Sequence, residues 1–175
     1  MRTSVAWVRV IGCSLLLLVI AIPAASMRLG LPDGSSEPED SAAYQAFTRT
    51  AEQFGAGANA PLLVVAELPA PLRDEDVLAE QVRIGTMLSW TRDVVAVAPI
   101  GVSEDGALLA FQVIPSGGPN SEETAQVVQS LRNSSPLYPG VELGVAGNAS
   151  GSIDISATLA DAMPRYLALV VGISL

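Results

Sequence analysis

Apolar residues are concentrated at the two ends of this chain, and the long stretch between the ends is acidic. The first end, from Val10 to Met27, contains no charged residue, and the nine residues after Tyr166 contain none either. A helix needs about 20 apolar residues to cross the hydrocarbon layer of a membrane. We therefore expect a transmembrane helix within residues 1–27, and over residues 149–175 a helix that descends into a second, truncated membrane segment. On this interpretation the chain is a fragment of a larger protein.

The charges are distributed unevenly around the first apolar segment. Arg2 and Arg9 precede it, whereas all 18 acidic residues follow it. Short arginine-containing ends stay on the cytoplasmic side of a membrane, so we expect an integral protein of the cell membrane with a cytoplasmic N-terminus and an extracytoplasmic main domain. The net charge of −9 argues against nucleic acid as a partner, because phosphate binding requires a basic surface.

The first apolar segment has two other interpretations. Ala24-Ala25-Ser26 could be the cleavage site of a secretory signal peptide, and Val10-Ile11-Gly12-Cys13 loosely resembles a lipoprotein box. Apolar residues continue well beyond Cys13, which does not fit the lipoprotein pattern. A helix over the whole uncharged stretch would measure about 27 Å at its usual rise per residue, nearly the hydrocarbon thickness. We favour an uncleaved anchor. Cys13 is the only cysteine, so no internal disulfide is possible.

The middle of the chain, residues 28–148, predicts one extracytoplasmic domain. Apolar runs of strand length occur at residues 62–68, 94–98, 107–114 and 141–146, and helical patterns occur at residues 74–90 and from 120 onward. The order strand, helix, strand, strand, helix, strand is that of the ferredoxin-like, split βαβ arrangement of the α+β class. In this topology the first and third strands are central. An additional helix is expected from Ser41 to Phe54, capped by Asp40 or Ser41.

The same patterns predict which side chains are buried. We expect residues 62–68 to be covered on both faces and residues 141–146 on one face. An apolar stripe should mark the buried side of each helix. The stripes comprise Tyr44, Phe47, Ala51 and Phe54; Leu78, Val82, Gly85 and Leu88; and Thr124, Val127, Val128 and Leu131. Asn120 and Glu123 suggest the start of the second domain helix. Pro164 should kink the last helix without ending it.

Three stretches together resemble one family of membrane transporters. They are Leu29-Gly30-Leu31-Pro32-Asp33, the segment from Phe54-Gly55-x-Gly57-x-Asn59-x-Pro61 to Val65, and the end of the chain from Ile153-Asp154-x-Ser156 to Leu175. The chain resembles the MMPL (mycobacterial membrane protein large) family of the resistance-nodulation-division superfamily. It is most similar to the second half of such proteins, where one membrane helix precedes the second porter domain.

The resemblance implies a proton-driven transporter that exports lipids, lipid-like metabolites or drugs. It also implies the partners of this piece, which are a second porter domain, the remaining membrane helices and the cargo. The proton relay of the family uses Asp and Tyr side chains in central membrane helices that this chain lacks, so no relay residue is assigned. Asp154 and Asp161 are expected outside the membrane. The alternative is a membrane-anchored extracellular binding or sensory domain.

No catalytic, cofactor-binding or metal-binding residue is predicted, and we expect no enzyme activity. The chain contains neither histidine nor lysine, which removes the usual general base and the Schiff-base nucleophile. The Gly55–Ala60 loop precedes a strand, whereas phosphate-binding loops open a helix. We interpret the acidic clusters at 37–40 and 74–76 as helix starts or solvated surface. Asn133 and Asn148 begin glycosylation triplets, although Asn148 fits a helix cap better.

Overall fold

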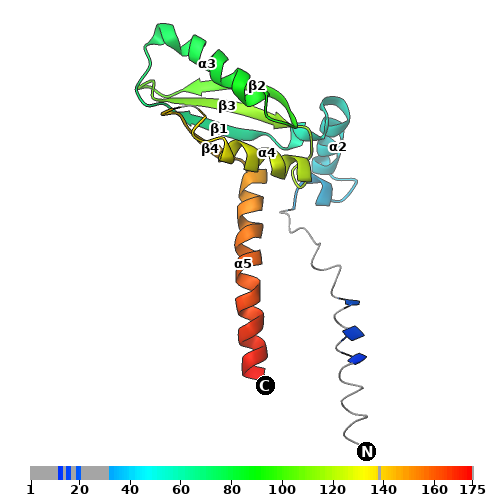
Figure 1. The fold of residues 1–175 in the computed structure, drawn as a ribbon. Helices are drawn as coiled ribbons and strands as arrows, with labels where there is room; N and C mark the ends of the chain where they lie inside the picture. Colours follow the sequence, from blue (N-terminus) through cyan, green and yellow to red (C-terminus); the bar gives the residue numbers. More distant parts are fainter. Residues whose placement is uncertain (1–11, 14, 17–18, 21–31, 138, 175) are drawn as a thin grey trace, which may run out of the picture.

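A four-stranded antiparallel sheet forms the centre of the domain. The computed structural model describes residues 12–13, 15–16, 19–20, 32–137 and 139–174. The strands are β1 (Leu62–Glu67), β2 (Val94–Val102), β3 (Leu108–Pro115) and β4 (Glu142–Ala146), in the spatial order β2-β3-β1-β4. Helices α3 (Asp74–Ser89) and α4 (Glu122–Asn133) cover one face of this sheet (Figure 1). The α+β class, the order of elements and the central positions of the first and third strands are confirmed.

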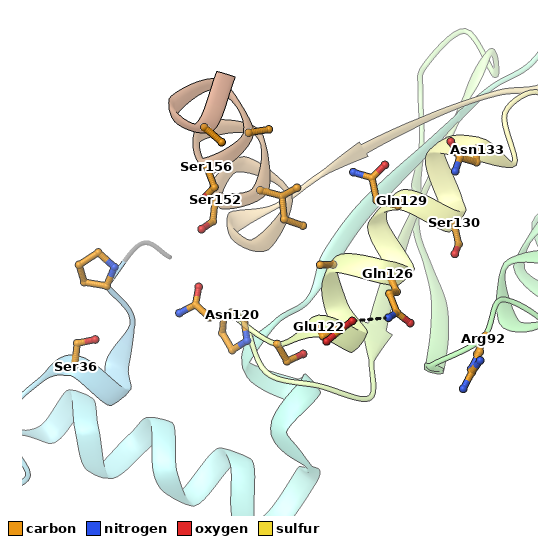
Figure 2. Close-up of a pocket in the computed structure, with 17 residues that line it drawn as sticks. Ser36, Arg92, Asn120, Glu122, Gln126, Gln129, Ser130, Asn133, Ser152 and Ser156 are labelled. Atoms are coloured by element: carbon orange, nitrogen blue, oxygen red, sulfur yellow. Dashed lines mark hydrogen bonds between the residues drawn. The ribbon is translucent and has the colours of Figure 1, made fainter. Parts of the chain in front are cut away.

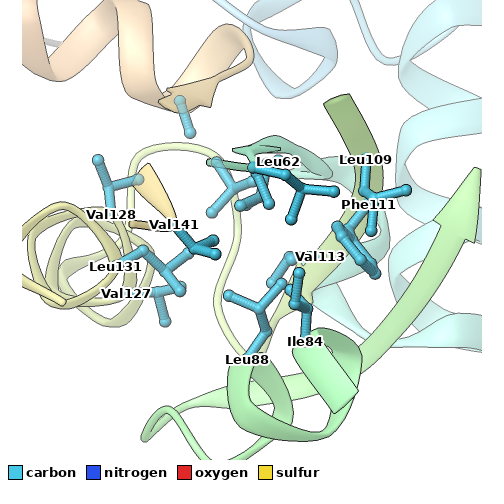
Figure 3. Packing of buried hydrophobic residues seen from close by; sticks show 14 residues of the cluster. Leu62, Ile84, Leu88, Leu109, Phe111, Val113, Val127, Val128, Leu131 and Val141 are labelled. Carbon is cyan, nitrogen blue, oxygen red and sulfur yellow. The ribbon is translucent and has the colours of Figure 1, made fainter. Parts of the chain in front are cut away.

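The hydrophobic core lies between the sheet and helices α3 and α4. Strand register places Val64 of β1 opposite Phe111 of β3, with both side chains fully buried. Figure 3 shows the two helices contributing to the same cluster from either side. Removing a large buried side chain from such a core costs about 2 to 5 kcal/mol. The largest buried members are Phe111, Leu62, Ile84, Leu88, Leu109, Leu131, Val64, Val113, Val127, Val128 and Val141.

The chain satisfies the first backbone N–H groups of two helices with serine caps. Ser41 Oγ accepts a hydrogen bond from the Tyr44 N–H at the start of α2 (Ala42–Phe54). Ser121 Oγ accepts from the Thr124 N–H at the start of α4. The predicted start of α4 at Asn120 was therefore wrong by one residue. Both residue types are good caps, and the Asn120 amide instead donates to Asp33 Oδ2, 3.1 Å away.

The predicted buried stripe of α3 was partly wrong. Leu88 is buried, as predicted, but Leu78 and Val82 are 69% and 61% exposed, and Ile84 is buried in their place. The helix is rotated relative to the prediction because the sequence offers two apolar stripes, and the one containing Ile84 packs against the sheet.

Two further burial predictions were wrong at the edges of the core. Phe54 at the end of α2 is 79% exposed, because α2 lies beside the sheet and buries no residue completely. Strand β1 is covered on one face only. Leu62, Val64 and Ala66 are buried, whereas Leu63 on the other face is exposed. Residues 141–146 were predicted to alternate between covered and exposed side chains, and this alternation is confirmed in β4.

Strand β2 is longer than predicted. It continues through Pro99 to Val102, with irregular pairing to β3 between Val94 and Ala96 and between Pro99 and Gly101. Proline is tolerated on an edge strand because only one side of that strand is paired. Since β2 is an outer strand of the sheet, Pro99 does not end it.

The last helix, α5 (Asn148–Ser174), projects from the domain (Figure 1). It continues past Pro164, as predicted, and Asp154 and Asp161 are exposed on it. Among the residues that the structure describes, no helix combines the length and the apolar character needed to cross a bilayer. Most of the transmembrane segment predicted within residues 1–27 lies outside the described residues. The predicted domain limits at 27/28 and 148/149 stay predictions.

Candidate functional site

A groove of about 1070 Å³ lies between α4, the first turns of α5 and the segment that leads into α2. Figure 2 shows that polar side chains from these separate parts of the chain surround it. Glu122 and Arg92 are its charged lining residues. The other polar lining residues carry amides or hydroxyls. They are Ser36, Asn120, Ser121, Gln126, Gln129, Ser130, Asn133, Ser152 and Ser156.

Helix α4 supplies most of the amide groups. Glu122, Gln126, Gln129 and Asn133 recur every three or four residues and are exposed on one side of the helix. The Gln126 amide donates to Glu122 Oε1, 3.2 Å away. The opposite side of α4 is held in the core by Val127, Val128 and Leu131. The burial of that side therefore determines which residues α4 presents to the groove.

The groove wall on α5 consists of Ile153 and of four small side chains, which are Ser152, Ser156, Ala157 and Ala160. Small side chains leave the helix backbone accessible to close approach by another polypeptide. The third wall is formed by Pro32 and Ser36. This wall is fixed by the hydrogen bond from Asn120 to Asp33, which in turn accepts from the Ser35 N–H at 2.9 Å.

A paired ionic contact fixes the position of α5 on the domain. Arg132 Nη1 and Nη2 lie 2.7 and 2.8 Å from Asp154 Oδ1 and Oδ2. Arg132 Nη2 also donates to Ser150 Oγ at 2.8 Å, and this hydroxyl donates to the Val145 carbonyl of β4 at 3.0 Å. The contact therefore joins α4, β4 and α5 beside the groove.

The ion pair also changes the protonation behaviour of its members. Hydrogen bonding from Arg132 lowers the pKa of Asp154, and the same contact raises the pKa of Arg132. Both groups remain ionised over a wider pH range as a result. Asp154, which sequence analysis placed outside the membrane and away from any proton relay, thus has a fixed cationic partner on the domain.

The Gly55–Ala60 loop is a structural connection between α2 and β1. Gly55 has a φ of +87°, and a Cβ on Gly57 would lie 1.6 Å from the Pro115 carbonyl oxygen. The Asn59 amide donates to the Phe47 carbonyl at 2.9 Å. These contacts agree with the interpretation of this loop as a turn.

The acidic clusters do not form a metal site within the described part of the chain, where no three Asp, Glu or Cys side chains converge. Asp74, Glu75 and Asp76 open α3, as predicted, and Arg73 forms ion pairs with Glu75 and Asp76. Asn133 ends α4 and lines the groove, while Asn148 begins α5.

The groove residues were not predicted as a set from the sequence. The three- and four-residue spacing of Glu122, Gln126, Gln129 and Asn133 was a usable signal, because it marks a polar helix face. Their proximity to Ser152 and Ser156 depends on the contact between α4 and α5, which no spacing reveals. Amide and hydroxyl groups can donate and accept hydrogen bonds, so this arrangement can bind a polar, largely uncharged surface.

The fold and the groove define a small split βαβ domain from which a long helix projects. The chain is similar to the "Membrane protein YdfJ" of Bacillus subtilis (strain 168), with 34% identity over 162 residues. The matched region covers 91% of this chain and 22% of the relative. The chain thus spans about a fifth of the length of the curated relative that it matches. No family model matches the chain.

Proposed function

We propose that this chain is the extracytoplasmic porter domain of a proton-driven exporter of the MMPL type, together with the membrane segments on either side of it. The observation that carries the proposal is the course of α5. This helix is joined to the domain by the Arg132–Asp154 pair and leads without interruption into the apolar residues beyond Tyr166. The similarity to a protein named as a membrane protein supports the same assignment.

In this proposal the domain contributes to the path of a lipid, a lipid-like metabolite or a drug outside the bilayer. The proton relay belongs to membrane helices elsewhere in the transporter. Asp154 has no part in it, because its carboxylate is held by Arg132 outside the apolar end of α5. Because α4 and α5 form two walls of the groove, a movement of α5 would change the width of the groove. In this way a movement of the membrane segment would alter the surface of the domain.

Export can be tested in cells that express the complete reading frame containing this chain. We expect expression to lower the accumulation of a lipophilic fluorescent dye such as Nile red, and a protonophore to abolish the difference. Arg132→Gln should reduce export, because it weakens the connection between α5 and the domain. Arg73→Gln is the matched control, since Arg73 also pairs with carboxylates but lies far along the chain from α5.

The alternative, a membrane-anchored binding or sensory domain, predicts a different result in the same experiment. Dye accumulation would then be equal with and without expression, and a protonophore would have no specific effect. Equal accumulation for several chemically distinct lipophilic dyes, with the protein present in the membrane, would contradict the transport proposal.

A further inference from the structure

The face of the sheet that points away from α3 and α4, here called the open face, is largely apolar. Residues paired across neighbouring strands point to the same side of a sheet. Val64 and Phe111 point into the core, so the residues that alternate with them belong to the open face. These residues are exposed or half-buried. The centre of the open face consists of Leu63 and Val65 of β1, Ala110 and Gln112 of β3, Ala98 of β2 and Gly144 of β4.

Strand β1 has the composition of a strand that is covered on both faces. Residues 62–66 are all apolar, whereas a strand with one solvated face alternates apolar and polar side chains. In the structure, the described residues cover β1 on the core face only. Val64 is fully buried, while Leu63 on the open face is 38% exposed. The composition of β1 therefore indicates that a further surface covers the open face.

Two carboxylates lie side by side at one end of the open face. Glu67, the last residue of β1, is paired directly with Glu142, the first residue of β4. Such opposite residues have Cβ atoms about 5 Å apart, and like charges there are destabilising. Both side chains are exposed, and none of the ion pairs among the described residues includes either one. An arginine brought to this end would remove the repulsion, because its guanidinium group can donate to both carboxylates.

The charges of the chain argue against a second copy as the covering surface. Each copy has a net charge of −9, so two copies repel each other. The four strands contain no arginine. Two open faces packed together would therefore add two further glutamates and no cation. An apolar protein surface of different sequence, with an arginine at its edge, is complementary to the open face.

We propose that another part of the same, longer protein docks on the open face and places an arginine between Glu67 and Glu142. The source of the docking surface is inferred from the relative, of which the matched region covers 22%, so most of such a protein lies outside a chain of this length. This inference shares with the proposed function the requirement for a longer protein, and it does not require transport. Export can fail while the open face is covered, so the two proposals are tested separately.

Maleimide labelling of the complete reading frame can test the docking. In a background without native cysteines, Gln112→Cys places one cysteine between Leu63 and Ala98 on the open face. Ala79→Cys places the control on the exposed side of α3. In the complete protein in detergent, we expect Gln112→Cys to react several-fold more slowly than Ala79→Cys. In the 175-residue chain the two cysteines should react at similar rates, because the covering part is absent.

Glu67→Arg distinguishes docking from the stability of the sheet. In the 175-residue chain this substitution replaces the like-charged pair with a cross-strand ion pair, so stability against urea should not decrease. In the complete protein it brings the new arginine against the proposed one, so labelling of Gln112→Cys should become several-fold faster. Glu52→Arg makes the same charge change on the exposed surface of α2 and should leave the labelling unchanged.

Four results would overturn the proposal. Equal rates for Gln112→Cys and Ala79→Cys in the complete protein, in membranes and in detergent, would show that nothing selectively covers the open face. Slow labelling of Gln112→Cys in membranes but not in detergent would assign this face to lipid or to a separate protein. Slow labelling in the 175-residue chain that depends on its concentration would assign it to a second copy. Unchanged labelling in the Glu67→Arg variant would exclude the arginine.

Discussion

Arg132 and Asp154 form a two-pronged ion pair between α4 and α5, with nitrogen–oxygen distances of 2.7 and 2.8 Å. The two residues are 22 positions apart in the sequence. Because Arg132 also donates to Ser150, one guanidinium group contacts the first two turns of α5. Arg132 therefore helps to hold the start of α5 on the domain, together with the buried Ala149 and the bond from Ser150 to Val145.

Arg132→Gln should destabilise the domain by about 1 kcal/mol. Partly exposed ion pairs usually contribute less than this. This pair is bidentate, however, and Arg132 makes an additional hydrogen bond, so its contribution should be larger. Urea unfolding in detergent, monitored by tryptophan fluorescence, measures the change. Arg73→Gln removes a more exposed pair and should change the unfolding free energy by less than about 0.5 kcal/mol. Equal effects of the two variants would contradict the structural role of Arg132.

The stabilising effect of Asp154 should depend on pH. Its pKa is lowered in the folded domain below the ordinary value of 3.8. A carboxyl group with a lowered folded pKa contributes stability above its unfolded pKa and loses it as the pH falls through the folded pKa. The difference in unfolding free energy between the natural chain and Asp154→Asn should be constant from pH 7 to 5 and decrease below pH 4. A constant difference down to pH 2 would contradict this assignment.

Gly57→Ala should destabilise the domain strongly, because the added Cβ would lie 1.6 Å from the Pro115 carbonyl oxygen. The backbone has to move to relieve this overlap, and such overpacking costs about 1 to 3 kcal/mol or more. Gly118→Ala is the matched control, since no atom lies within 4 Å of the corresponding Cβ. Thermal unfolding of the two variants should separate them clearly, with Gly118→Ala close to the natural chain.

The rotation of α3 predicts unequal effects of two leucine substitutions on one helix. Leu88→Ala should cost about 2 to 5 kcal/mol, because its side chain is completely buried. Leu78→Ala should be nearly neutral, since its side chain is 69% exposed and alanine favours helices. Comparable losses in urea unfolding would instead support the stripe predicted from the sequence.

The elements of the fold followed from local patterns, whereas the orientation of some helices did not. The alternation in β4 and the cap at Ser41 are properties of adjacent residues, and the sequence contains them directly. In α3, however, Leu78 and Ile84 belong to competing stripes, and only packing against the sheet selects the one that is buried. The continuation of β2 through Pro99 depends on its edge position, which is a property of the assembled sheet.

The groove was less predictable from the sequence than the elements of the fold. Gln126 and Gln129 could be placed on a polar face of α4 from their spacing alone. Their proximity to Ser156 depends on the packing of α5 beside α4, which brings together segments distant in sequence. The polar face was thus predictable from the sequence, and the groove it forms with α5 was not.

The proposed function requires that the domain lies outside the membrane while the N-terminus lies inside. Labelling of intact cells with a membrane-impermeant maleimide tests this most directly, using single cysteines introduced as Ser134→Cys and Thr3→Cys in the Cys13→Ser background. Ser134 is exposed at the end of α4, so we predict labelling of Ser134→Cys in intact cells and of Thr3→Cys only after permeabilisation. Labelling of Ser134→Cys only after permeabilisation would place the domain in the cytoplasm and contradict the account.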